Sequence, residues 1–121
     1  MFSAQLLDHF QNPRNAGRLA DADASVRVEN PVCGDTLQLS LRIEDGRIAE
    51  IRFLAKGCVA AVACGSAVTE LALAKGVREA REICTEDVVR AVGGLPEASA
   101  HAGQLAVEAL RAALAEARVR G

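Results

Sequence analysis

Apolar and polar residues alternate without a break along residues 36–43, which is the pattern of a half-buried strand. The apolar members are Leu37, Leu39, Leu41 and Ile43, and the polar members are Thr36, Gln38, Ser40 and Arg42. The Asp45-Gly46 pair that follows is typical of a two-residue hairpin turn. A shorter strand before the hairpin is marked by Val26 and Val28.

A returning strand is predicted after the turn, because Ile51, Phe53 and Ala55 recur at every second position. Ile48 is out of phase with these three residues, which predicts a β-bulge near Ala49. Alternation of this kind is typical of an antiparallel sheet that has one face covered.

The first helix is predicted between Ser3, a suitable N-cap, and Pro13, which ends it. Its apolar side is predicted to consist of Leu6, Leu7 and Phe10. His9 lies beside Asp8 on this helix, and we interpret it as a surface or capping residue.

Helical periodicity dominates the second half of the chain. After residue 58 the apolar residues at helical spacing are Ala60, Cys64, Ala67, Val68 and Leu71. Gly76 is the predicted end of that helix, and Thr85 is predicted to cap a short helix whose first turn holds Glu86 and Asp87. In a last helix, from about residue 100, the same spacing is kept by Ala106, Leu110, Ala113, Leu114 and Ala117. These elements predict a single α+β domain, residues 1–121, with helices packed on one face of a three-stranded antiparallel sheet.

Composition narrows the possible functions. The chain has 121 residues, a net charge of −2 and three Phe as its only aromatic residues, so we expect an aliphatic core and neither a nucleic-acid nor a membrane partner. No secretory signal and no apolar stretch of about 18 residues is visible, so a cytoplasmic location is expected. In that setting the four cysteines are expected to be thiols rather than disulfides.

Possible metal ligands collect at three junctions of the predicted elements. Cys33 and Asp35 lie in the turn before the long strand, Cys58 follows the returning strand, and His101 lies near the start of the last helix. Because the start of one hairpin strand neighbours the end of its partner, Cys33, Asp35 and Cys58 are expected to converge. The position of His101 does not follow from hairpin geometry, since it depends on how the helix packs.

Two thiolates, a carboxylate and an imidazole suit tetrahedral Zn²⁺ and also suit iron. Cys58 is predicted to begin a helix, where free N–H groups and the helix dipole lower the pKa of a thiol. A structural interpretation competes with this one, because isolated cysteines are commonly buried small residues. We interpret Cys84 and Cys64 in that way, and the wide spacing of the candidate ligands matches no compact zinc finger.

Four segments resemble the IscU/NifU-type iron–sulfur cluster assembly scaffolds along nearly the whole chain. They are DHFQNPRNAG (8–17), NPVCGDTLQL (30–39), FLAKGCVAAVACGSAVTE (53–70) and LPEASAHAGQLAVEALRAAL (95–114). The resemblance implies a three-stranded antiparallel sheet with helices on one face, in agreement with the periodicity.

The resemblance also implies a function and a site. Such scaffolds are binding proteins rather than enzymes: a cysteine desulfurase delivers sulfur, iron arrives, and a [2Fe–2S] cluster is assembled and passed to apo-proteins. When the family's ligand pattern is carried over residue by residue, the implied ligands of the cluster or of iron are Cys33, Asp35, Cys58 and His101. Asp35 corresponds to the carboxylate that keeps the cluster labile. The same residues can also hold Zn²⁺ in the isolated protein.

Two departures from the family pattern change these expectations. Ala102 stands where the family carries a third cysteine next to the histidine, so sulfur acceptance would fall to Cys58 or Cys33. Cys64 is a reserve thiol only if the start of its helix unravels. The segment 95–99 reads LPEAS where many scaffolds have Leu-Pro-Pro-Val-Lys, which argues against recognition by a specialised Hsp70 chaperone.

Two alternatives to a cluster scaffold remain open at this point. One is a zinc-binding sulfur-relay partner of a cysteine desulfurase, although the zinc-binding subfamily carries an insertion before the last helix that this chain lacks. The other is a degenerate family member that binds a metal and builds no cluster, which the alanine at position 102 favours.

Overall fold

The computed structural model describes residues 1–31 and 34–120, and the side chains of residues 1–31 and 34–117. Its elements, in chain order, are α1 (Ala4–Gln11), β1 (Ala24–Glu29), β2 (Thr36–Glu44), β3 (Arg47–Lys56), α2 (Val59–Ala72), α3 (Val77–Arg81), α4 (Thr85–Ala91), a 3₁₀ turn (Glu97–Ser99) and α5 (His101–Arg120). No helix in this part of the chain is both long enough and apolar enough to cross a membrane.

The sheet is antiparallel and has the strand order β1-β2-β3. Along the β2–β3 ladder Arg42 pairs with Glu50, but the next residue, Ile43, pairs with Ile48. Ala49 is therefore the extra residue of a β-bulge, as its phase in the sequence predicted. The bulge returns Ile48 to the buried face of the sheet, where its side chain is fully buried.

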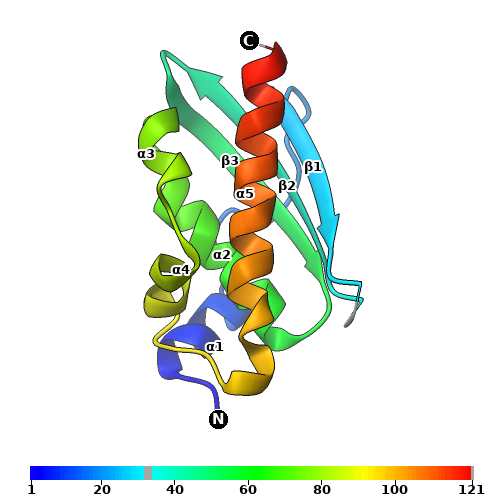
Figure 1. The fold of residues 1–121 in the computed structure, drawn as a ribbon, viewed down its shortest axis with the longest axis vertical. Coiled ribbons are helices and arrows are strands. Elements are labelled where there is room, and N and C mark those ends of the chain that lie inside the picture. The colour runs from blue at the N-terminus through cyan, green and yellow to red at the C-terminus, as the bar shows by residue number, and fades with distance from the viewer. Residues whose placement is uncertain (32–33, 121) are drawn as a thin grey trace.

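Helices α2 and α5 lie side by side across one face of the sheet (Figure 1). α5 packs on β1 and β2, and α2 packs on β3. The apolar residues that they cover are Leu37, Leu39, Leu41, Ile51 and Phe53. The covering residues of α5 are Ala106, Leu110, Ala113, Leu114 and Ala117, all of which are buried. The predicted architecture is confirmed, and its core is almost entirely aliphatic.

The first helix packs through a different side from the one predicted. Ser3 does cap it, since its hydroxyl accepts a hydrogen bond from the Leu6 backbone N–H at 2.9 Å. However, Leu6 and His9 are the buried residues, whereas Leu7 and Phe10 are each 39% exposed. A hydrogen-bonding partner on α2 makes burial of the imidazole favourable, and periodicity of apolar residues alone does not reveal such a partner.

The end of α2 also differs from the prediction. The helix stops at Ala72, and Ala74 has a positive φ of 70° that reverses the chain. Gly76 has an ordinary φ of −64° and is the N-cap of the short helix α3, which the sequence analysis did not predict. A five-residue helix carries too little periodicity to be recognised by pattern.

The cap of α4 is Cys84 rather than Thr85, which is the first residue of the helix. Glu86 and Asp87 lie in the first turn as predicted, and Asp87 accepts a hydrogen bond from the Cys84 backbone N–H at 2.9 Å. Cys84 is partly exposed, and its thiol donates to the same carboxylate at 3.2 Å. The expectation of a buried Cys84 is therefore wrong, because its carboxylate partner keeps it at the surface.

Candidate metal-binding site

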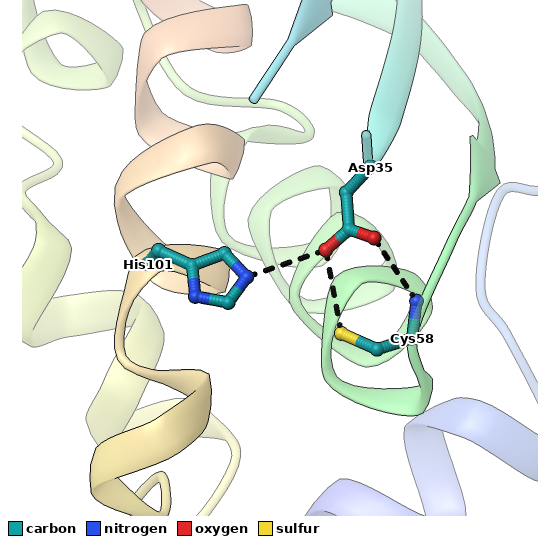
Figure 2. A group of neighbouring side chains, drawn as sticks. All are labelled: Asp35, Cys58 and His101. Carbon is teal, nitrogen blue, oxygen red and sulfur yellow. Dashed lines mark hydrogen bonds and ion pairs between the residues drawn. The ribbon is translucent and has the colours of Figure 1, made fainter. Parts of the chain in front are cut away.

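Three side chains from three different elements meet at one end of the sheet (Figure 2). Asp35 immediately precedes β2, Cys58 is the N-cap of α2, and His101 is the first residue of α5. One ligand atom from each of them, a carboxylate oxygen, a sulfur and an imidazole nitrogen, all lie within 4.8 Å of one another. Three donors at this spacing are close enough to bind a single metal ion.

Asp35 is the centre of the cluster. Its Oδ2 lies 3.3 Å from Nε2 of His101 and accepts a hydrogen bond from the Cys58 thiol at 3.5 Å. Its Oδ1 accepts a hydrogen bond from the Cys58 backbone N–H at 3.3 Å. The aspartate is buried, whereas Cys58 is exposed and the His101 side chain is 28% exposed. The site is therefore accessible from solvent through its thiol and its imidazole.

Local folding explains why Asp35 and Cys58 are neighbours. Thr36, which follows Asp35, pairs with Lys56, two residues before Cys58, and it also pairs with Glu29 at the end of β1. The turn between β1 and β2 is tied by a hydrogen bond from the Asn30 N–H to the Asp35 carbonyl at 2.8 Å. The hairpin argument from the sequence is thereby confirmed for Asp35 and Cys58.

His101 arrives by a different route. It opens α5, and this helix is held in place by its packing on β1 and β2. The 3₁₀ turn Glu97–Ser99 leads directly into the helix. Tertiary packing thus adds the imidazole to a pair of ligands that strand pairing already brings together.

The thiol of Cys58 has a raised pKa, which is opposite to the predicted direction. Partial burial is the main cause, and the negative charge of Asp35 and its hydrogen bond with the thiol act in the same direction. Hydrogen bonds from the backbone N–H groups of Ala61 and Ala60 lower the pKa, as expected at a helix start, but they are outweighed. Burial and the nearby carboxylate therefore reverse the direction that the helix start alone would give.

Cys33 and Cys64 are the predicted ligand and the predicted reserve thiol that remain to be considered. Cys33, the fourth predicted ligand, lies outside the described residues, so its part in the site stays a prediction. Cys64 is fully buried on the core side of α2, as expected, and burial raises the pKa of its thiol to about 12. A thiol with that pKa is protonated at neutral pH. Ala102, next to His101, is also buried in the core.

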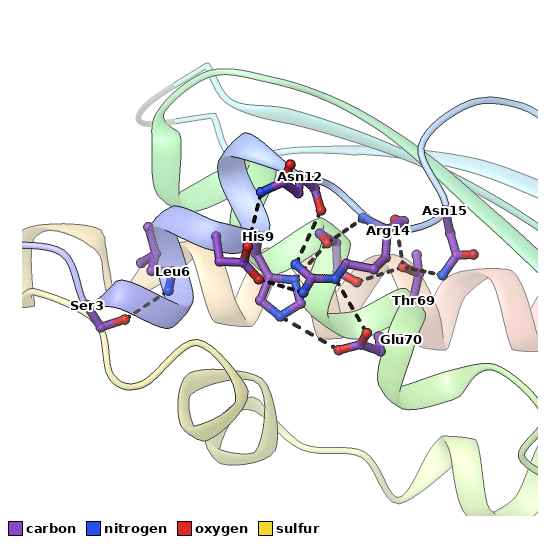
Figure 3. Close-up of polar contacts among 10 residues, drawn as sticks. Ser3, Leu6, His9, Asn12, Arg14, Asn15, Thr69 and Glu70 are labelled. Atoms are coloured by element: carbon purple, nitrogen blue, oxygen red, sulfur yellow. Dashed lines mark hydrogen bonds and ion pairs between the residues drawn. The ribbon is translucent and has the colours of Figure 1, made fainter.

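His9 is a buried residue rather than a surface or capping one, and it belongs to a polar network that reaches from the core to the surface (Figure 3). Its Nδ1 lies 2.8 Å from the Ser66 hydroxyl, which also accepts a hydrogen bond from the Arg14 N–H at 2.9 Å. Its Nε2 lies 3.8 Å from Glu70, and Arg14 reaches the same carboxylate group at 3.5 Å. The network fixes α1 and the following loop to α2, the helix that Cys58 caps. The only sign of this burial in the sequence is that His9 follows Leu6 by three residues, which places both on the same face of a helix.

The donor set suits a metal that accepts mixed sulfur, oxygen and nitrogen ligands. Thiolate, carboxylate and imidazole are all found at zinc sites, and iron also accepts them. Three protein ligands leave one tetrahedral position for a fourth donor.

Comparison with known proteins assigns the chain to a family. A family model described as the NifU-like N terminal domain matches residues 1–120. The chain is 45% identical over 116 residues to the iron-sulfur cluster assembly scaffold protein IscU 1 of Archaeoglobus fulgidus, covering 96% of this chain and 76% of the relative. It is 36% identical over 119 residues to the iron-sulfur cluster assembly scaffold protein IscU of Escherichia coli, covering 95% and 92%.

Solved structures agree at the level of the fold. The N-terminal NifU-like protein of Brucella abortus has a TM-score of 0.80 at 18% identity and covers 98% of this chain and 95% of its own. A SUF-system scaffold described as putative, from Fervidobacterium islandicum, has a TM-score of 0.77 at 17% identity, with 93% and 96% covered. The family model and the two relatives show that the chain belongs to the NifU-like N-terminal domain family.

Proposed function

We propose that this protein is an iron–sulfur cluster assembly scaffold or carrier. It binds iron or a [2Fe–2S] cluster as cargo, built with sulfur from a cysteine desulfurase, and passes it to apo-proteins. The observation that carries the proposal is the convergence of Asp35, Cys58 and His101 at a solvent-accessible end of the sheet. Support also comes from the relatives, which are named as cluster assembly scaffolds.

The proposed ligands are Cys33, Asp35, Cys58 and His101. A [2Fe–2S] cluster takes four protein ligands, and histidine replaces cysteine in some such clusters. The four donors match that number. A carboxylate is a harder ligand than a thiolate and binds iron in a cluster less firmly, which suits a cargo that must be released.

Sulfur acceptance is assigned to Cys58, with Cys33 as the alternative. The Cys58 thiolate attacks the outer sulfur of the desulfurase persulfide, the S–S bond breaks, and the desulfurase cysteine leaves as a thiolate. The exposure of Cys58 permits this approach, whereas Cys64 is buried and its pKa is raised to about 12. Reduction of the carried sulfur to sulfide takes two electrons, for which we name a dithiol as the reductant.

The proposal treats residues 1–121 as one domain that acts by binding and delivery rather than by turnover. Its partners are then the desulfurase and the apo-proteins that receive the cargo, and the LPEAS segment argues against the Hsp70 route. The reducing conditions of the cytoplasm, which keep thiols from pairing, suit such a carrier.

A zinc-binding sulfur relay is the second candidate, and the donor set of Asp35, Cys58 and His101 is the observation that favours it. The site lacks the third thiol of the family, and one thiolate, one carboxylate and one imidazole already suit Zn²⁺. In that case Cys58 would accept sulfur without building a cluster. A member that binds metal and handles no sulfur is the limiting form of this alternative.

Anaerobic reconstitution separates these functions. The protein is incubated with ferrous iron, L-cysteine, a cysteine desulfurase and a dithiol, and then freed of unbound material. A scaffold is expected to hold equal amounts of iron and acid-labile sulfide and to absorb visible light. The Cys58→Ala variant is expected to lose the sulfide and the visible absorption. Bound zinc or iron without sulfide in the wild type would refute the scaffold proposal and leave the relay or the degenerate member.

A further inference from the structure

The Asp35 carboxylate lies directly against the backbone of Gly57. This glycine connects β3 to α2 and has a positive φ of 137°. A Cβ atom built at Gly57 would lie 2.0 Å from Oδ1 of Asp35, 2.6 Å from its Cγ and 3.0 Å from its Cβ. Contacts this short do not occur between folded side chains, so any L-residue at position 57 collides with the carboxylate.

The collision would fall on the side chain of Asp35 rather than on the backbone. The nearest atom is the end of a rotatable side chain, which moves more easily than a strand or a helix. Asp35 is buried, however, and Oδ1 is held by the Cys58 backbone N–H at 3.3 Å. A displaced carboxylate would therefore lose this hydrogen bond and leave the place where it meets Cys58 and His101.

We propose that Gly57 is a positioning residue for Asp35. Because it has no side chain, it leaves the space that the carboxylate must occupy to act as a metal ligand. The inference rests on the proposed metal-handling function of this site. Gly57 is thus required for a reason beyond its backbone conformation.

Backbone strain alone is the competing explanation, and the chain contains a matched control for it. Gly17 has a φ of 130°, close to that of Gly57, but a Cβ at Gly17 would meet nothing within 4 Å. An alanine at either position adds similar strain, but only the alanine at position 57 meets Asp35.

The test measures Co²⁺ affinity by competition with a chelator of known affinity. Gly57→Ala is expected to weaken binding by about 10- to 100-fold, the range typical of residues that orient a metal ligand. Asp35→Gly should weaken binding by the same factor, and Gly17→Ala should leave it within about twofold of the wild type. The double variant Asp35→Gly/Gly57→Ala should bind no more weakly than Asp35→Gly alone. Wild-type affinity in Gly57→Ala, or a further loss in the double variant, would overturn the inference.

A metal-free measurement keeps this inference separable from the proposed function. Protection of the Cys58 amide against hydrogen–deuterium exchange reports its hydrogen bond to Asp35. Protection should fall in Gly57→Ala and in Asp35→Gly, and it should stay at the wild-type level in Gly17→Ala. If the wild type binds no Co²⁺, the proposed function fails, while wild-type protection of this amide in Gly57→Ala refutes the role of Gly57.

Folding of the variants also decides between the explanations. If Gly57→Ala does not fold, the double variant, in which the colliding carboxylate is gone, should recover the circular dichroism spectrum of the wild type. A double variant that remains unfolded would assign the role of Gly57 to backbone strain and contradict the proposal.

Discussion

Nε2 of His101 lies 3.3 Å from Oδ2 of Asp35, although 66 residues separate the two in the chain. The contact exists because α5 packs across β1 and β2 and begins at the end of the sheet where β2 starts. The same carboxylate oxygen accepts a hydrogen bond from the Cys58 thiol. Asp35 thus joins the two other candidate ligands, and a bound metal would have to take over both contacts.

Restoring the third cysteine should strengthen the cluster. Ala102 is buried beside His101, so Ala102→Cys adds a sulfur close to the site with a stability cost of about 1 kcal/mol for the larger side chain. We expect a higher yield of sulfide per protein after reconstitution and a slower loss of visible absorption to a chelator.

The matched control is Ala102→Ser, which adds a side chain of similar size without a thiolate. If Ala102→Ser raises cluster yield as much as Ala102→Cys does, the gain comes from packing and not from ligation.

The charge of Asp35 should control the reactivity of Cys58. Burial is the larger reason for its raised pKa, but the Asp35 carboxylate contributes in the same direction. Asp35→Asn removes the charge and nearly keeps the shape, so the pKa of the Cys58 thiol should fall and more thiolate should form at pH 8. We expect faster alkylation of Cys58 by iodoacetamide, followed residue by residue with mass spectrometry in the metal-free protein.

Asp87→Asn serves as the comparison, because Asp87 contacts the Cys84 thiol at 3.2 Å and takes no part in the hydrogen bonds of Cys58. Asp87→Asn should accelerate the alkylation of Cys84 and leave the alkylation rate of Cys58 unchanged. Equal alkylation of Cys58 in wild type and Asp35→Asn would show that burial alone raises its pKa.

Cys64 should be dispensable for the chemistry. It is fully buried with a pKa of about 12, so it offers no thiolate at neutral pH. We expect Cys64→Ala to take up iron and sulfur as the wild type does and to lose about 1 kcal/mol of stability from the small cavity. A loss of sulfide uptake in this variant, with its fold intact, would instead support the reserve-thiol role.

The pH dependence of stability should trace to His9. Burial is the main cause of its lowered pKa, and the positive charge of Arg14 adds to it, while Glu70 and Asp8 act in the opposite direction. Because the folded state disfavours protonation of this imidazole, its contribution is complete above the ordinary histidine pKa of about 6.5 and is lost as pH falls below it. Urea unfolding at a series of pH values should show the midpoint declining on the acid side.

His9→Asn should flatten that decline, because an asparagine amide can occupy the Nδ1 position beside Ser66 without titrating. His101→Asn, which changes the other histidine, should keep the decline. If His9→Asn keeps the acid-side slope of the wild type, another group is responsible.

The parts of the fold that could be predicted are those determined by local pattern. The phase of Ile48 against Ile51 and Phe53 predicted the bulge at Ala49, and the hairpin turn predicted that Asp35 and Cys58 would be neighbours. Both follow from the two-residue period of strands, which links the sequence directly to a face and an end of the sheet.

The parts that could not be predicted depend on tertiary contacts. His9 is polar and beside a charged residue, and only its hydrogen bond to Ser66, 57 residues away, explains its burial. The pKa of Cys58 depends on burial and on a carboxylate from the turn before β2, and His101 reaches the site only through helix packing. The family resemblance named His101 as a ligand, but residue spacing did not.

X-ray absorption of the zinc-loaded protein tests most directly whether Asp35, Cys58 and His101 form one metal site. We expect a mixed shell, with sulfur at about 2.3 Å and nitrogen or oxygen at about 2.0–2.1 Å, together with imidazole scattering. The chain has only two histidines, so this scattering should vanish in His101→Ala and persist in His9→Asn. Imidazole scattering that survives in His101→Ala, or a shell without sulfur, would contradict the site described above.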